Sequence, residues 1–340
     1  MKNKRKKRNR KSKNRKHYLS IGLILVTALV LGVAGLASWL PRKEEARAQE
    51  EQHETSSGSG LEEGQVTHNG QVYEYNKELK TLLFLGVDKR ESELTEHLPG
   101  RGGQADCILV FIMDPSDQTI RTLQISRDTI VDIDVYDISG EKFTTEPGQI
   151  TLQYAYGDGK QKSCWLMEQA VSKLLYGVEI DGYFAMNLEG FSVATDLVGG
   201  VTLTVPEDYT AIDPAFEQGA TVEMDGDLAR KYVQTRDITV LGSNDGRMER
   251  QAQYLEALAQ KMTQGGGNVV FYTKMFNDLQ DYIVTDMSAD QLAEMSDYEF
   301  TGTVKAPGET RAGEEHDEYY VDEEALYELI LELFYVPVQQ

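Results

Sequence analysis

Acidic and basic side chains gather around the ends of three apolar segments in the first half of the sequence. A pair of aspartates at neighbouring strand ends can hold Mg²⁺, which prefers oxygen ligands and keeps water and phosphate oxygens in its shell. Arginines beside them can bind phosphate bidentately, because the guanidinium is a planar fork. We interpret the set as a candidate metal and phosphate site, with plain surface ion pairs as the alternative. The residues are Asp88, Lys89, Arg90, Asp106, Arg127 and Asp128.

The three apolar segments are predicted to be β-strands that bring these side chains together. Their ranges are Thr81–Val87, Asp106–Asp114 and Gln118–Ser126. The tetrapeptide PSDQ turns between the last two, which therefore form an antiparallel hairpin. If the first two strands are also antiparallel neighbours, all the charged residues above reach one edge of a sheet.

A second basic group lies in the sequence DGRMERQ, from Asp245 to Gln251. Asp245 can cap the N-terminus of a helix, and Arg247, Arg250 and Gln251 then stand at i, i+3 and i+4 on one side of its first turns. Arginine at a helix N-terminus is unfavourable against the helix dipole unless an anion binds there. The pattern favours a further part of the anion site, and a solvated helix face is the alternative.

The rest of the pattern predicts an α/β fold with a mixed central sheet flanked by helices on both faces. Amphipathic periodicity predicts helices at Lys162–Leu175 and Ser243–Met262, and an acidic helix at Glu323–Phe334. Strand-like runs at Gly182–Met186 and Val201–Val205 enclose a further short helix between them, near residues 189–197.

The N-terminus predicts a single-pass membrane anchor. Residues 18–40 carry no charge, and as a helix they extend roughly 35 Å, enough to cross a hydrocarbon core of roughly 30 Å. Eleven Lys and Arg lie in residues 1–17, so this basic tail is predicted to stay cytoplasmic and the C-terminal domain to lie outside the cell membrane. A cleaved secretory signal is the alternative, because Gly35 and Ala37 form a small-residue pattern.

Composition divides the rest of the chain into three parts. Residues 41–71 are polar and are predicted to be a stalk, because they contain too few apolar side chains to build a core. Residues 72–304 form the predicted folded domain, which is long enough for one substantial core. Residues 305–340 are predicted to be a polar loop, over Gly308–Glu318, and the acidic C-terminal helix.

Net charge argues against nucleic acid as a partner. The whole chain carries −22 at pH 7, and the part without the eleven basic residues of the N-terminal tail carries −33. Nucleic-acid affinity comes largely from Lys and Arg that neutralise phosphates, so phosphate must bind here through a local cluster or a metal ion. The two cysteines, Cys107 and Cys164, are too few for a disulfide scaffold and form either one disulfide or two isolated thiols.

Seven sequence blocks resemble, in order, the successive motifs of the LytR-CpsA-Psr family. They extend over roughly residues 82–263, behind the N-terminal anchor that this family usually has. Each block alone is unspecific, but the order of all seven is specific. The blocks are LFLGVDKR (Leu83–Arg90), GQADCILVFIMDP (Gly103–Pro115), ISRDT (Ile125–Thr129), QYAYGDG (Gln153–Gly159), IDGYFAMNLEGF (Ile180–Phe191), DLVGGVTLTV (Asp196–Val205), and YVQTRD followed by DGRMERQ (Tyr232–Asp237, Asp245–Gln251).

The resemblance implies a membrane-anchored phosphotransferase of Gram-positive cell walls. Members of the family move a glycopolymer, such as teichoic acid or capsule, from an undecaprenyl-pyrophosphate carrier to peptidoglycan. The expected partners are therefore the carrier-linked glycopolymer, peptidoglycan and the membrane. The family holds the prenyl chain in an apolar tunnel between sheet and helices. Phe191–Val198 and Tyr254–Leu258 are candidates to line it, and a packed core is the alternative, because it predicts the same pattern.

The resemblance also implies roles for single residues. Asp88 and Asp106 match the ligands of Mg²⁺, and Asp245 is expected to orient Arg247. The base that activates the acceptor hydroxyl is either Asp88 or Asp128. The catalytic set is expected to be Asp88, Arg127, Asp128, Arg236 and Arg247, and the substrate-binding set Arg90, Gln104, Arg127, Gln234, Arg236, Arg247, Arg250 and Gln251.

Two glutamines depart from the family pattern. Gln104 and Gln234 stand where the family commonly has phosphate-binding arginines, and glutamine can donate a hydrogen bond to phosphate but carries no charge. We interpret the site as tuned down or redirected, with Arg90 or Arg101 as candidates to compensate. Two alternatives to a transferase are therefore open. They are a non-catalytic polyprenyl-pyrophosphate-binding or regulatory protein of the same fold, and a Mg²⁺-dependent hydrolase of the pyrophosphate lipid.

Overall fold

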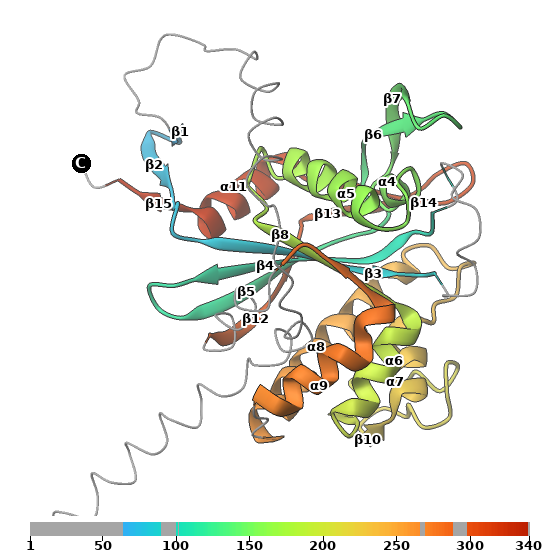
Figure 1. Cartoon of the computed structure of the whole chain (residues 1–340). Helices are drawn as coiled ribbons and strands as arrows, with labels where there is room; N and C mark the ends of the chain where they lie inside the picture. The colour runs from blue at the N-terminus through green and yellow to red at the C-terminus, as the bar shows by residue number, and fades with distance from the viewer. Residues whose placement is uncertain (1–63, 90–99, 101, 266–268, 288–297, 339–340) are drawn as a thin grey trace, which may run out of the picture.

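A six-stranded mixed sheet forms the centre of the computed structural model, which describes residues 64–89, 100, 102–265, 269–287 and 298–338 (Figure 1). The strand order is β11-β8-β3-β4-β5-β12. Its strands are β3 (Lys80–Val87), β4 (Ala105–Asp114), β5 (Thr119–Ile125), β8 (Gly182–Asn187), β11 (Ile283–Thr285) and β12 (Glu299–Lys305).

The pairing of β3, β4 and β5 confirms the sequence prediction. β3 and β4 are antiparallel, with Leu85 opposite Ile108, and β4 and β5 are antiparallel, with Ile108 opposite Ile125. β8 pairs with the other side of β3 in parallel. The end of β3, the start of β4 and the end of β5 therefore meet at one edge, where the charged residues lie.

Helices cover both faces of the sheet, as predicted (Figure 1). Because side chains alternate along a strand, Leu83 and Leu85 pack on one face with α5 and α11, while Leu82 and Phe84 pack on the other with α6, α8 and α9. The helices are α4 (Leu152–Ala155), α5 (Gln161–Leu174), α6 (Leu188–Leu197), α7 (Gly226–Gln234), α8 (Ser243–Gly265), α9 (Val269–Leu279) and α11 (Glu323–Phe334), with the 3-10 turn η2 (Gln280–Tyr282).

Four small antiparallel units surround the central sheet. One of them, the hairpin of β6 and β7, follows directly after the charged edge, because β6 begins three residues beyond Arg127. The units are β1 (Gln65–His68), β2 (Gln71–Tyr75) and β15 (Tyr335–Pro337); β6 (Ile130–Tyr136) and β7 (Lys142–Gln149); β9 (Val201–Thr204) and β10 (Thr221–Met224); and β13 (Gly308–Ala312) and β14 (Asp317–Val321).

Both predicted boundaries of the folded domain differ from the structure. Residues 65–71, predicted as part of the stalk, form β1 and the start of β2, because β15 from the far end of the chain pairs with β2. The C-terminal segment predicted as a polar loop is the β13–β14 hairpin. The segment from residue 299 onward belongs to the main fold, since β12 extends the sheet and α11, the acidic helix predicted at Glu323–Phe334, packs into its core.

Of the two alternatives for the cysteines, one disulfide or two isolated thiols, the structure shows isolated thiols. Cys107 packs with the face that carries α6 and α8, while Cys164 is buried on the opposite face, and both are free. The predicted anchor at residues 18–40 lies outside the described residues. Within the described part of the chain, none of the helices has the length and apolar character needed to span a bilayer.

Candidate active site

Asp106 lies at the centre of the charged edge, where it accepts hydrogen bonds from two arginines. Arg127, which follows β5, donates from Nη1 to Asp106 Oδ1. Arg247, from the first turns of α8, donates from Nη1 to Asp106 Oδ2 at 3.2 Å. A strand end and a helix start that are far apart in sequence thus meet on one carboxylate.

Arg127 extends the cluster to two further side chains. Its Nη2 donates to the amide oxygen Oε1 of Gln104, and its Nε lies 3.4 Å from Oδ1 of Asp128. Arg236, two residues after α7, places Nη1 3.9 Å from Oδ2 of Asp128. The predicted arginines at positions 127, 236 and 247 therefore converge, and the aspartates at 106 and 128 are shared between them.

Arg247 is almost completely enclosed by protein. The residue is 3% exposed, and burial lowers the pKa of its guanidinium, while the nearby charge of Asp106 acts in the opposite direction. Asn244 Oδ1 accepts from its Nε and Nη2 at 3.1 and 2.7 Å. Asp245, expected to orient Arg247, instead accepts from Lys305 Nζ at 2.5 Å, so the orienting residue is its neighbour Asn244.

Asp128 is also buried, at 2% exposure. Burial raises the pKa of its carboxyl group, and the charges of Arg127 and Arg236 lower it again. Gln149 Nε2 donates to Asp128 Oδ1 at 3.1 Å. Enclosed between two arginines and an amide, Asp128 is placed to hold those arginines in position.

Asp88 faces solvent at the end of β3. Its Oδ1 accepts from the backbone N–H of Gln104 at 2.8 Å, across a turn that Gly103 permits with φ of +91°. Partial burial of the carboxylate raises its pKa, the hydrogen bond from Gln104 lowers it, and the charge of Asp106 raises it. Asp88 is therefore the accessible carboxylate of the cluster.

Asp88 and Asp106 suit a hard divalent cation. The strands that carry them are hydrogen-bonded neighbours, since Asp88 N donates to Gln104 O at 3.1 Å. Burial and the nearby charge of Asp106 both disfavour the ionised form of Asp88, and a bound cation would favour it. The described residues contain no group of three or more metal-ligating side chains, so water and phosphate oxygens would complete the shell, as is usual for Mg²⁺.

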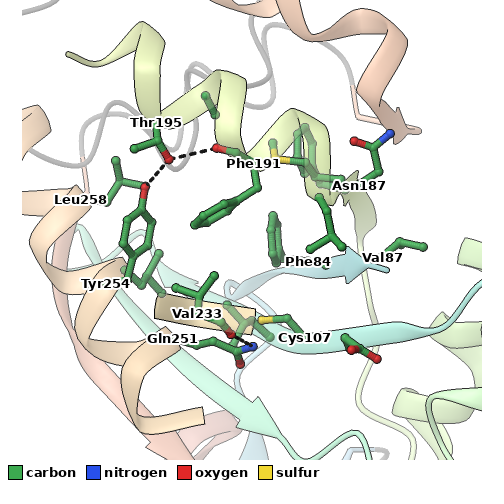
Figure 2. Close-up of a pocket in the computed structure, with 18 of the residues that line it drawn as sticks. Phe84, Val87, Cys107, Asn187, Phe191, Thr195, Val233, Gln251, Tyr254 and Leu258 are labelled. Atoms are coloured by element: carbon green, nitrogen blue, oxygen red, sulfur yellow. Dashed lines mark hydrogen bonds between the residues drawn. The ribbon is translucent and has the colours of Figure 1, made fainter. Parts of the chain in front are cut away.

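An apolar cavity opens next to this cluster. It encloses about 1100 Å³, including the open space at its mouth, and lies between the sheet and helices α6 and α8. Figure 2 shows Phe191 and Tyr254 on facing helices, with Tyr254 and Thr195 joined by a hydrogen bond of 2.7 Å. The polar residues Asp106, Gln234 and Gln251 also line it. The segments predicted to line a tunnel therefore do line a cavity.

The other predicted binding residues are placed differently. Arg250 is turned toward α7, where Nε donates to Tyr232 O at 2.7 Å and Nη2 to Thr235 O, so it satisfies carbonyls at the end of that helix. Gln251 Nε2 donates to Val233 O at 3.2 Å (Figure 2). Arg90 and Arg101 lie outside the described residues.

Three neutral side chains of the site were missed by the sequence reasoning. Asn244 and Gln149 contact the charged cluster directly, and Gln124 Nε2 donates to Met248 O at 3.2 Å and to Gln251 Oε1 at 3.3 Å. Gln124 is 4% exposed, but β5 also carries Thr119, Arg121 and Thr122, so one more polar residue in this strand does not single it out. Asn244 and Gln149 give no signal either.

Most of the chain matches one protein family. Residues 40–329 match the LytR_cpsA_psr family. The chain belongs to the LytR-CpsA-Psr family. The family resemblance predicted from the seven sequence blocks is thereby confirmed.

Curated relatives in the LytR-CpsA-Psr family carry the name polyisoprenyl-teichoic acid–peptidoglycan teichoic acid transferase TagU. The chain is 27% identical to the TagU protein of Bacillus subtilis over 295 residues, which are 86% of this chain and 85% of the relative. It is 27% identical to that of Enterococcus faecalis over 290 residues, 84% of each chain.

A solved structure described as TagT bound to LIIa-WTA shares the fold. It superposes with a TM-score of 0.57 at 20% identity and covers 76% of this chain and 90% of the other.

Proposed function

We propose that this LytR-CpsA-Psr protein transfers a glycopolymer from a polyprenyl-pyrophosphate carrier to peptidoglycan. The observation that carries the proposal is the junction of a charged cluster with an apolar cavity at Asp106, which lines the cavity and pairs with Arg127 and Arg247. A molecule with an apolar chain and a pyrophosphate head fits that junction. The names of the TagU relatives support the same reaction class.

The arginines would act on the charge that develops during transfer. The acceptor hydroxyl oxygen attacks the phosphorus that carries the polymer, and the bond from that phosphorus to the carrier phosphate breaks, so that polyprenyl phosphate leaves. Arg127, Arg236 and Arg247 would bind the pyrophosphate oxygens and stabilise the leaving phosphate. Positioning and electrostatic stabilisation supply most of the acceleration in phosphoryl transfer.

The choice of base follows from accessibility. Asp128 is enclosed by Arg127, Arg236 and Gln149, whereas Asp88 faces solvent. We therefore assign acceptance of the proton from the acceptor hydroxyl to Asp88.

Asp88 and Asp106 would also be the residues that hold Mg²⁺. When bound, the ion would neutralise phosphate charge in the transition state. Because two carboxylates leave most of the coordination shell to water and phosphate, affinity for the metal should depend on the pyrophosphate substrate.

The deciding experiment gives the purified full-length chain a polyprenyl-pyrophosphate glycan and a peptidoglycan oligomer, and resolves the products by mass. A phosphodiester-linked glycan on the oligomer supports the transferase. Free phosphorylated glycan would instead identify a hydrolase. Bound but unchanged lipid would identify the non-catalytic binding protein that the neutral Gln104 and Gln234 leave open.

Filling the cavity should weaken binding of the prenyl chain. Leu258 lines the cavity and is partly buried, so Leu258→Trp should displace prenyl carbons from it. At about 0.8 kcal/mol per buried CH₂, loss of two such groups already weakens binding about tenfold. Glu256→Trp, on the exposed side of the same helix, is the matched control. Calorimetry should show unchanged affinity for inorganic pyrophosphate in both variants. If both variants bind the lipid with equal affinity, the cavity does not hold the prenyl chain.

We also propose that the domain is held outside the cell membrane with the basic N-terminus inside. The support is the uncharged segment 18–40 behind eleven Lys and Arg. Protease added to intact protoplasts should digest the domain and spare residues 1–17. A domain that is protected until the membrane is opened would reverse the topology and exclude peptidoglycan as acceptor.

A further inference from the structure

We propose that Asn244 is a positioning residue that sets the direction of the Arg247 guanidinium and, through it, the geometry of the pyrophosphate site. The inference rests on the proposed function, because it concerns how that site holds its anion. Neither the sequence blocks nor the relatives' names assign a role to this residue.

The contacts between the two side chains fix the plane of the guanidinium. Asn244 Oδ1 accepts from both Nε and Nη2 of Arg247, at 3.1 and 2.7 Å. Since the guanidinium is planar and rigid, holding this edge directs Nη1 toward Asp106. Nη1 lies 3.2 Å from Asp106 Oδ2.

Asn244 is in turn fixed from behind. It is 2% exposed, and its Nδ2 donates to Ser126 Oγ at 3.0 Å. Ser126 Oγ also accepts from the backbone N–H of Asp128 at 3.3 Å, and Ser126 directly precedes Arg127 in the chain. Asn244 therefore links the start of α8 to the end of β5, and fixes Arg247 relative to Arg127.

A neutral acceptor suits this task. A guanidinium that is 3% exposed needs acceptors for its N–H groups. A third carboxylate would supply them, but it would also cancel more of the positive charge that attracts the pyrophosphate. The amide oxygen of Asn244 satisfies Arg247 without adding negative charge, so the cation stays available for an anion.

The test is a double-mutant cycle on the full-length chain, with geranylgeranyl pyrophosphate as the probe and geranylgeraniol as the probe without phosphate. Asn244→Ala should weaken binding of the pyrophosphate by about ten- to a hundredfold, because loss of a well-placed hydrogen bond to a charged group has effects of that size. The same change should leave geranylgeraniol binding as it is. Asn277→Ala, on the exposed side of α9, is the control.

The coupling energy between Asn244 and Arg247 distinguishes a residue that positions Arg247 from one that only stabilises the fold. If Asn244 acts through Arg247, then Asn244→Ala should cost little more affinity in an Arg247→Ala background. Additive losses would overturn the proposal, as would an Asn244→Ala protein that binds the pyrophosphate like the wild type. If Asn244→Ala does not fold, Asn244→Ser completes the same cycle, since a serine hydroxyl is too short to reach Nη2. A wild-type chain that fails to bind the pyrophosphate more tightly than the alcohol would instead contradict the proposed function.

Discussion

Replacing Arg127 with alanine should lower the rate of glycopolymer transfer by about 10²- to 10³-fold, the range found when one preorganised donor is removed from a transition-state site. Arg127 contacts Asp106, Gln104 and Asp128 at once, so its loss removes a donor to the substrate and also loosens the cluster. Single-turnover measurement of the phosphodiester product gives the rate directly.

Two comparisons separate charge from geometry in this experiment. Arg121→Ala changes a partly exposed arginine of β5, the strand that Arg127 follows. Arg121 pairs with Glu332 at 2.8 Å, and its replacement should leave transfer unchanged. Arg127→Lys keeps the charge but loses the fork that reaches two acceptors, so it should recover only part of the rate. A wild-type rate in Arg127→Ala would show that the cluster is structural and does not bind the substrate.

The charged edge could be predicted from the sequence because it depends on strand ends. Apolar runs indicated β3 and β4, a shorter segment that mixes apolar and polar residues indicated β5, and a short turn fixed the β4–β5 hairpin. With the antiparallel register of β3 and β4, Asp88, Asp106 and Arg127 come together. The cavity could not be derived from periodicity, since apolar faces of α6 and α8 that pack against the sheet predict a filled core equally well, and only the family resemblance suggested a tunnel.

The C-terminal part of the domain could not be predicted, because its pairings are long-range. Polarity made residues 308–318 resemble a loop, but β13 and β14 pair with each other, and Tyr319 N donates to Asp128 O at 2.8 Å. In the same hairpin, Asp317 Oδ2 accepts a hydrogen bond from Gly242 N at 2.9 Å. Gly242 belongs to the loop that carries Arg236. A segment assigned no chemistry thus supports two site residues.

Neutral side chains at the site were the hardest to interpret from sequence. Gln104 was interpreted as a missing cation, whereas in the structure its Oε1 accepts from Arg127 and its backbone N–H donates to Asp88. An arginine at this position would donate where Gln104 accepts and would repel Arg127. The interpretation of the site as tuned down stays a prediction, but the structure gives Gln104 a partner in Arg127.

Replacing Asp106 with alanine should abolish Mg²⁺-dependent transfer and also destabilise the fold. Asp106 is one of two proposed metal ligands and pairs with both Arg127 and Arg247. Removing one partner of a buried ion pair typically costs about 3–5 kcal/mol, because the remaining charges have no counterpart. Denaturant unfolding measures this loss, and Asp114→Ala, at the opposite end of the same strand, should cause little of it.

The same Asp106→Ala variant should bind metal-free pyrophosphate more tightly than the wild type does. In the wild type the carboxylate competes with the anion for Arg127 and Arg247, and without it both guanidinium groups are free to bind phosphate oxygens. Inorganic pyrophosphate in chelator-treated buffer should therefore raise the melting temperature of the variant by more than that of the wild type, since at equal concentration the ligand that binds more tightly stabilises the folded protein more. Addition of Mg²⁺ should reverse the order, because only the wild type retains both carboxylates. Full transfer activity of Asp106→Ala in the absence of metal would contradict the metal assignment, and an equal thermal shift in both proteins would show that Asp106 does not compete for the arginines.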